Sequence, residues 1–440
     1  LPPGTWTRSF PPPLSALTVT VSSNGSSFIA TNPELGVLKA ASGLPLFTGG
    51  GDLQITTQVV PATSGYDIVY HISNPTAEHQ PLPTLNIYGL QIESQVDYLD
   101  LSFGTVFKPL QWTPASAAIT EQNPYPTTRF APVSIIRDRR IAVGVSIKYP
   151  VLDYKHAVSP QFRRYSDMSD NWMTFVSMMG AAVAPGESRT YTVTTRFARP
   201  ADWIHSLAPY RDYLWLQFGD HAHYSQDLRP IKGRTESVSE LINLDTNPRG
   251  FIPYHWDDGV VSRTDSHGWR RTVDRILDIL HNGGFRRFVL WTPSGLYSDP
   301  SHYPITNGEP QFPSRIMTDW SPAMLASQQE LQRIPAEGIE LGYWWGDSAM
   351  VEYEWNPAEV YPLDINNPSH VAMLDEQLYL ANERGATWIG LDSYRRLDLW
   401  NAVPWLARMQ SQFPNLRFSA EPNCSDILLF LIPFTTDSRN

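Results

Sequence analysis

Acidic side chains follow the predicted strands in the second half of the chain, at or just beyond the residue where each strand ends. They are Asp257 and Asp258 after the first strand, Asp347 after the third, Asp392 after the fourth, Glu421 after the fifth and Asp437 after the sixth. In a barrel of parallel strands, reactive side chains gather at the carboxyl ends of the strands. Each acid alone could equally be a helix N-cap or a solvated loop residue. Their joint placement predicts a cluster of carboxyl groups at one mouth.

Tryptophans occur at the same strand ends. Trp256 precedes the aspartate pair, and Trp291 and Trp345 end the second and third predicted strands. Ten of the 15 tryptophans lie after residue 250. Sugars stack their apolar C–H faces on such rings, although large core side chains are the competing interpretation. Carboxyl groups and indoles in one cleft are what glycoside hydrolysis requires: a nucleophile or base, a proton-donating acid and stacking surfaces.

An alternation of strands and helices has to position these residues. The apolar patterns predict strands at 250–256, 285–291, 338–346, 387–392, 416–421 and 427–434, and helices at 268–284, 322–334, 368–385 and 397–413. Alternation at this spacing is typical of a parallel α/β domain. We therefore predict a (β/α)8-type (TIM) barrel over 236–440. Only six strands can be counted, so the barrel is expected to be incomplete at the C-terminus.

The first half of the chain predicts a different fold class. Apolar and polar residues alternate at period two in 17–23, 53–60, 66–73, 141–149 and 189–198, which are rich in Val, Ile, Thr and Tyr. Turn residues follow at 23–27 and 48–52. Long strands with one polar face favour a large β-sandwich. The chain is thus predicted to be multidomain, with a β-sandwich over 1–235 and the barrel over 236–440.

Composition excludes several other classes of function. A net charge of −11 without a basic stripe argues against nucleic acid as a partner, and no apolar run is long enough to span a bilayer. The single cysteine, Cys424, allows no intrachain disulfide, and the scattered histidines form no HExxH pattern, so no metal or other cofactor is expected. The first residue is Leu1, which favours a processed, secreted or periplasmic protein. The sequence leaves open whether copies of the chain form a homo-oligomer.

An ordered set of segments resembles the melibiase and raffinose-synthase family of glycoside hydrolases. The segments are "GIELGYWWGDSAMVE" at 338–352, "PLDINNPSH" at 362–370, "IGLDSYR" at 389–395, "AEPNCSD" at 420–426 and "TTDSRN" at 435–440. They match the family's order of strand, loop, helix and strand around its nucleophilic aspartate. The β-rich first half is similar to the mutarotase-like sandwich that precedes the barrel in this clan.

The resemblance implies a role for each matching residue. Asp392 would be the nucleophile that forms a covalent glycosyl-enzyme, and Asp437 would be the acid/base. Glu421 is the rival acid/base, because related enzymes acting on N-acetylgalactosamine use a glutamate after strand five. In a retaining enzyme the two carboxyl groups lie roughly 5 Å apart. Cys424 would lie in the substrate-binding loop, and Asp257 and Asp258 would bind sugar hydroxyl groups.

Two departures from the family concern the sugar. The lysine usually found two residues before the nucleophile is replaced by Gly390, and "EPE" after strand three is replaced by "GDS" at 346–348. The resemblance implies a retaining enzyme of α-galactosidase or α-N-acetylgalactosaminidase type. Both departures remove groups that hold galactose in that family, so they leave the sugar undetermined. Arg395 and Arg396 could bind an anionic substituent of an oligosaccharide or glycoconjugate, or they could equally pair with Asp398 or cap a helix. The alternative is a non-catalytic carbohydrate-binding or structural protein on a glycosidase-like scaffold.

Overall fold

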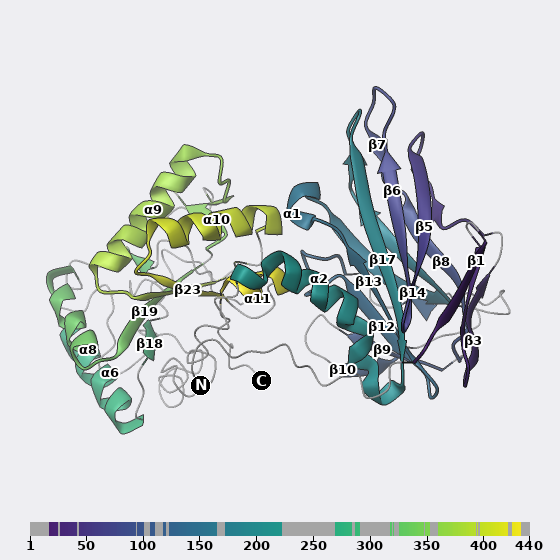
Figure 1. Ribbon diagram of the computed structural model, residues 1–440. Coiled ribbons are helices and arrows are strands. Elements are labelled where there is room, and N and C mark those ends of the chain that lie inside the picture. The colour runs from purple at the N-terminus through teal and green to yellow at the C-terminus, as the bar shows by residue number, and fades with distance from the viewer. Residues whose placement is uncertain are drawn as a thin grey trace. The chain divides into compact units, whose positions relative to one another are not determined.

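The computed structural model divides into two compact units, Leu1–Asp220 (unit 1) and His221–Asn440 (unit 2), each of which is described here by itself (Figure 1). The residues that the structure describes are 17–24, 27–41, 44–93, 95–100, 106–110, 118–119, 123–164, 172–221, 269–283, 287–290, 317–318, 320, 325–346, 348–352, 360–392, 394, 397–420 and 425–432. The predicted domain boundary at 235 lies outside them.

Unit 1 consists mainly of two large antiparallel sheets. The first has the order β1-β2-β3-β8-β15-β14-β11, with β4 also paired to β8, and the second has the order β10-β9-β12-β13-β17-β6-β5. Strands of the first are β1 (Thr20–Asn24), β2 (Ser27–Asn32), β3 (Gly36–Ala41), β4 (Phe47–Thr48), β8 (Thr84–Leu90), β11 (Ala118–Ile119), β14 (Ala157–Arg164) and β15 (Trp172–Met179). Strands of the second are β5 (Gln54–Ala62), β6 (Gly65–Ser73), β9 (Asp97–Asp100), β10 (Val106–Pro109), β12 (Val133–Arg137), β13 (Ala142–Lys148) and β17 (Ser188–Ala198). A small sheet pairs β7 (Gln80–Pro81) with β16 (Ala182–Val183).

Period-two patterning explains the core of unit 1. On β6, alternate residues are buried, namely Tyr66, Ile68, Tyr70 and Ile72. Two contacts join these residues to the other sheet: the rings of Tyr66 and Phe28 meet edge to face at 4.7 Å, and the Tyr70 hydroxyl donates to the Leu46 carbonyl at 3.1 Å. The strands predicted at 53–60, 66–73, 141–149 and 189–198 are confirmed to within a few residues, and the strand predicted at 17–23 begins three residues late.

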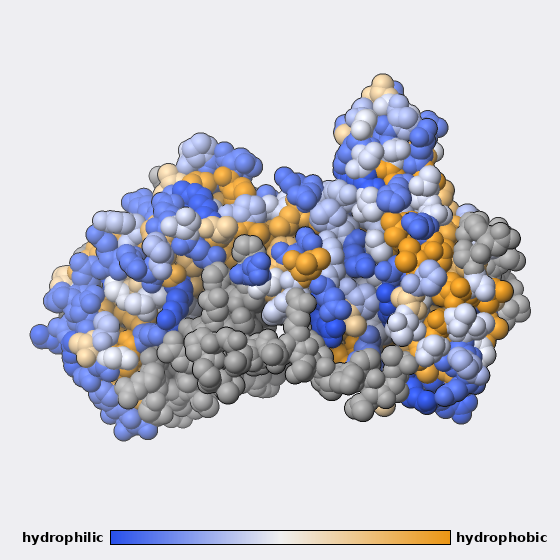
Figure 2. All heavy atoms as spheres, in the orientation of Figure 1, coloured by the Kyte–Doolittle hydropathy of each residue, from blue (hydrophilic) through white to orange (hydrophobic). Residues whose placement is uncertain are grey.

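Helices cover part of the outer face of the second sheet. They are η1 (Pro200–Leu207), α2 (Ala208–Phe218) and η2 (Gly219–His221), which follow β17 directly, while the short α1 (Val151–Tyr154) follows β13. A Cβ added at Gly144 of β13 would lie 2.3 Å from the Ser206 hydroxyl oxygen, so only glycine lets η1 approach this closely. In the view of Figure 2, the protruding end of unit 1 near β7 is mostly hydrophilic, and hydrophobic residues gather lower, over the strands.

Unit 2 contains a four-stranded parallel sheet in the order β18-β19-β22-β23. Its strands are β18 (Arg287–Leu290), β19 (Glu340–Trp345), β22 (Trp388–Leu391) and β23 (Arg417–Ala420), and all three pairings between neighbours are parallel. A separate antiparallel pair consists of β20 (Met350–Glu352) and β21 (Val360–Pro362). The strands predicted at 285–291, 338–346, 387–392 and 416–421 are therefore confirmed, and the strand predicted at 250–256 lies outside the described residues.

Helices alternate with these parallel strands, as predicted. They are α6 (Trp269–Gly283), η6 (Gln328–Gln332), α8 (Arg333–Ala336), α9 (Pro368–Glu383), α10 (Leu399–Gln412) and α11 (Asp426–Leu431). The apolar stripe expected on α6 is buried: Val273, Ile276, Leu277 and Leu280 are each at most 6% exposed. None of the helices in the described part of the chain is long and apolar enough to cross a membrane.

Two predicted elements of unit 2 were wrong. The apolar run at 427–434 was expected to be a buried strand, yet α11 covers Asp426–Leu431. A short run without periodicity fits a buried strand and a buried helix equally well, and Asp426 supplies a helix-start signal, since its Oδ1 accepts from the Ile427 amide at 2.9 Å. The single helix expected at 322–334 is interrupted: residues 325 and 326 are helical, Ser327 is a turn, and the 3-10 helix η6 and the four-residue α8 follow, while 321–324 lie outside the described residues. Within the described residues, unit 2 shows four parallel strands and no closed barrel.

Candidate functional site

Asp392 directly follows β22, which lies between β19 and β23 in the parallel sheet. Its amide donates to the Trp345 carbonyl at 3.1 Å, so the pairing with β19 continues one residue beyond the strand. Ser348 then donates twice to the Asp392 carbonyl, from its amide at 3.0 Å and from its hydroxyl at 2.7 Å. These three bonds fix the backbone of an aspartate that is only 7% exposed.

Two tryptophans and two glycines interlock on one face of this sheet. Trp344 is paired with Gly390 across β19 and β22, and Gly342 is paired with Trp388. A Cβ added at Gly390 would lie 2.3 Å from Cε3 of Trp344, and one added at Gly342 would lie 3.0 Å from Cε3 of Trp388. Each indole therefore occupies the space that its glycine partner leaves empty. Because side chains of a strand alternate, the pleat of β22 predicts Asp392 on the same face.

The opposite face of the sheet packs on α9. The Trp345 indole is fully buried, and its Nε1–H donates to Oε1 of Gln377 on α9 at 2.8 Å. The Tyr343 hydroxyl donates to the Arg384 carbonyl, just after α9, at 2.7 Å. Trp345 thus has a packing partner in the described structure. Its role as a sugar-stacking surface stays a prediction.

Burial changes the acidity of two groups near the strand ends. Burial raises the pKa of the Tyr343 phenol, which keeps it protonated as the donor to Arg384. Burial also raises the pKa of Asp398, the residue before α10. The Asp398 side chain makes no capping hydrogen bond to α10.

Asp392 and Trp345 are the sequence-predicted site residues that the structure describes. The other predicted site residues lie outside the described part of the chain: Trp256, Asp257, Asp258, Trp291, Asp347, Arg395, Glu421, Cys424 and Asp437. The described ends of β19, β22 and β23 are neighbours: Trp345 pairs with Leu391, and Leu391 pairs with Ala420. The gathering of the acids themselves stays a prediction. No group of His, Cys, Asp and Glu in the described ranges could hold a metal ion.

Sequence reasoning did not single out Ser348 or Gln377. Ser348 was part of the "GDS" segment and was considered only as a lost acid, and Gln377 is one polar residue on a mostly apolar helix face. A buried glutamine opposite a strand tryptophan is a signal for a packing hydrogen bond. That signal becomes readable once α9 and β19 are known to pack together.

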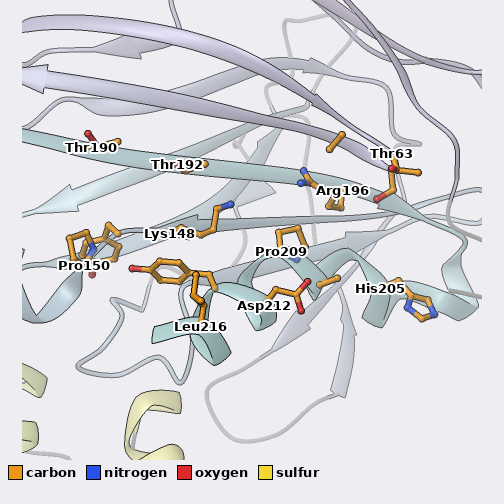
Figure 3. Close-up of a pocket in the computed structure, with 15 residues that line it drawn as sticks. Thr63, Lys148, Pro150, Thr190, Thr192, Arg196, His205, Pro209, Asp212 and Leu216 are labelled. Atoms are coloured by element: carbon orange, nitrogen blue, oxygen red, sulfur yellow. The ribbon is translucent and has the colours of Figure 1, made fainter. Parts of the chain in front are cut away.

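A second polar site, which the sequence analysis also missed, lies wholly within unit 1. It is a pocket of about 740 Å³ between the outer face of β13 and β17 and the helices η1 and α2 (Figure 3). Lys148 and Arg196 extend into it from these two strands. The lining is completed by hydroxyl, aromatic and helix residues, namely Thr63, Ser64, Tyr149, Thr190, Thr192, His205, Asp212, Tyr213 and others.

One carboxylate joins the two cations at this pocket. Oδ1 of Asp67 lies 2.7 Å from Nη1 of Arg196, and its Oδ2 lies 3.3 Å from Nζ of Lys148. All three side chains are mostly buried, with exposed fractions between 11% and 22%. Arg196 also donates to the Tyr66 carbonyl at 2.8 Å, which fixes the guanidinium. Two cations and one anion leave a net positive charge at this group.

No protein-family model and no curated protein matches the sequence. Among solved structures, the chain is similar to an α-galactosidase from Thermus thermophilus in complex with stachyose, with 10% identity, 95% of this chain and 77% of that chain covered and a TM-score of 0.41. It is also similar to a β-arabinopyranosidase, with 12% identity, 93% and 66% covered and a TM-score of 0.38. A Flavobacterium johnsoniae GH31 dextranase complexed with glucose gives 9% identity, 92% and 47% covered and a TM-score of 0.36. TM-scores this low carry no conclusion about substrate or mechanism.

Proposed function

We propose that the chain is a retaining glycoside hydrolase that cleaves α-glycosidic bonds, with Asp392 as the nucleophile. The observation that carries the proposal is the place of Asp392, a buried carboxyl group directly after an inner strand of a parallel sheet. The ordered resemblance of 338–440 to melibiase and raffinose-synthase enzymes supports the same role. The finer fold that belongs to this proposal is a β-sandwich followed by a (β/α)8-type barrel.

Fixing the nucleophile's backbone suits the chemistry. In double displacement, the carboxylate attacks the anomeric carbon while an acid protonates the leaving oxygen, and the same acid then deprotonates water. Attack requires the carboxylate oxygen to be held close to that carbon, and small displacements are costly. The bonds from Ser348 and to Trp345 hold the Asp392 main chain on both sides. Asp437 or Glu421 would supply the proton, from segments that follow β22 in the sequence.

The sugar is the less determined part of the proposal. A lysine at position 390 would need the space that the Trp344 ring occupies, because even a methyl group there would overlap the indole. The sheet surface beneath the proposed site is thus flat and aromatic where the resembling family has a cation. We propose an α-glycoside substrate at the end of an oligosaccharide or glycoconjugate, and the sugar is to be found by screening.

The experiment is a screen of aryl α-glycosides of galactose, N-acetylgalactosamine, glucose and related sugars with wild type and Asp392→Ala. A matched control is Asp278→Asn, which changes an exposed acid on α6 of the same unit. The expected result is turnover by wild type and by the control, and loss by several orders of magnitude in Asp392→Ala. Adding azide to Asp392→Ala should then yield a β-glycosyl azide, since azide enters from the face that the carboxylate vacates.

Three outcomes would contradict the proposal. Turnover unaffected in Asp392→Ala would remove Asp392 as the nucleophile. A product of inverted configuration in the wild-type reaction, followed by NMR, would exclude double displacement. Absence of turnover on all substrates, together with sugar binding that survives the substitution, would favour a non-catalytic carbohydrate-binding protein.

A further inference from the structure

The pocket of unit 1 has the size of a small-molecule site, and cationic, hydroxyl and aromatic side chains line it. Its volume of about 740 Å³ lies within the range of roughly 300 to 1,000 Å³ that ligand pockets usually have. A bare inorganic ion would leave most of this space unfilled. The occupant is therefore expected to be of monosaccharide size or larger.

The charged end of the pocket favours an anionic group. Both oxygens of Asp67 are already engaged, one by Arg196 and the other by Lys148. The Lys148 ammonium has three N–H donors, and Asp67 is the acceptor that the structure gives it. The second acid of the pocket, Asp212, is engaged by Arg211, whose Nε and Nη2 lie 2.9 and 2.7 Å from its Oδ1. The positive charge at Lys148 and Arg196 is thus left for a ligand.

The walls of the pocket favour a ligand with many hydroxyl groups. Thr63, Ser64, Thr190 and Thr192 contribute hydroxyls, and Tyr149 and Tyr213 contribute rings. Thr192 is the strand partner of Lys148 across β13 and β17, so the two side chains are neighbours on the same face of the sheet. Burial and the nearby acid Asp153 raise the pKa of Tyr213 to about 12, which keeps this phenol a neutral hydrogen-bond donor. Hydroxyl and ring surfaces around a cation suit a sugar that carries a carboxylate.

We infer that this pocket of unit 1 binds an acidic sugar, with its carboxylate on Lys148 and Arg196 and its hydroxyl groups along β17. The inference does not depend on Asp392, because the pocket belongs entirely to unit 1. Two sources of this ligand share one chemistry: a free monosaccharide acid, or the acidic terminal residue of a polysaccharide.

The experiment is isothermal titration of the full chain with glucuronate, a glucuronate-terminated oligosaccharide, glucose and acetate. Glucuronate or the oligosaccharide should bind, and glucose and acetate should bind at least tenfold more weakly, because each lacks half of the recognised groups. Tighter binding of the oligosaccharide would identify the polysaccharide end as the source, and equal binding would identify the free acid. Equal affinity for acetate or glucose, or no binding of either acidic ligand, would overturn the inference.

Variants locate the binding within the chain. Lys148→Met keeps the length of the side chain and removes its charge, and roughly a ten- to hundredfold loss of glucuronate affinity is expected from losing one charge-assisted bond. Lys155→Met, an exposed lysine outside the pocket, is the matched control and should bind like wild type. Thr192→Val removes one hydroxyl of the pocket lining without changing the size of the side chain, and the glucuronate affinity should fall a few-fold. Unchanged binding in Lys148→Met with an unchanged melting temperature would refute the site.

Discussion

The interlocked face of the parallel sheet gives a sharp prediction for Gly390→Ala. The added methyl carbon would lie 2.3 Å from Cε3 and 2.7 Å from Cζ3 of Trp344, whereas carbon atoms in contact prefer about 3.5 to 4.0 Å. The ring would have to move by more than 1 Å, yet Trp344 is 2% exposed and shares a buried cluster with Trp388. Overpacking a filled core in this way costs about 1 to 3 kcal/mol, and we expect the upper part of that range.

Calorimetry of the full chain can measure this effect. A loss of about 3 kcal/mol corresponds to a fall of roughly 6 to 12 °C in the melting temperature of a unit of this size. Gly342→Ala is the matched comparison, because its methyl group would lie 3.0 Å from Cε3 of Trp388 and demands a smaller adjustment. The double variant Gly390→Ala, Trp344→Leu should recover part of the loss through the smaller side chain. A fall for Gly342→Ala equal to or larger than that for Gly390→Ala would refute the reasoning.

Three further predictions concern packing and charge. Burial lowers the pKa of Lys39 from its ordinary 10.5 to about 8, so the unfolded chain binds the proton more tightly than the folded chain. The free energy of unfolding of wild type should therefore rise by up to about 3 kcal/mol between pH 8 and pH 10.5. Urea titrations at each pH should show this rise for wild type and not for Lys39→Met. Trp345→Phe leaves the buried Oε1 of Gln377 without its hydrogen-bond donor and should lower the free energy of unfolding by about 1 to 3 kcal/mol. Adding Gln377→Leu to this variant should restore part of the loss, and no restoration would contradict the expectation. Arg408 donates to both carboxylate oxygens of Asp375, and a lysine cannot make this paired contact. Arg408→Lys should therefore lower the free energy of unfolding by about 1 kcal/mol, whereas the control Arg139→Lys, at an exposed arginine, should leave it unchanged.

Local periodicity was enough to predict much of the fold. The segment 66–73 alternates because one face meets the core and the other does not, and α6 shows its stripe because only one side is buried. The alternation of 189–198 predicts the strand β17 correctly, although residues 193–198 are buried on both faces. The run at 427–434 failed for the converse reason: it is apolar throughout, so no period distinguishes a buried helix from a buried strand.

The sites depended on pairings that sequence alone does not give. Asp392 was predicted because a strand end can be recognised locally. The Lys148–Asp67–Arg196 group was missed because its members come from three strands, and each is only one polar residue on an alternating face. Strand order and register bring them together: β13 pairs with β17, and β17 pairs with β6. Neither pairing follows from the composition of the strands.

The strand order of unit 1 also has a consequence for synthesis on the ribosome. β6 is complete early, yet one of its two neighbours in the sheet is β17, and the bond from Arg196 to Tyr66 joins residues 130 positions apart. The β6 edge of the β5–β6 hairpin therefore stays unpaired until almost all of unit 1 has been made. Long-range pairing of this kind slows folding, and open strand edges promote aggregation. The nascent chain is thus most exposed to misassembly between the emergence of β6 and that of β17, and chaperone capture or slowed translation in that interval should raise the yield of folded protein.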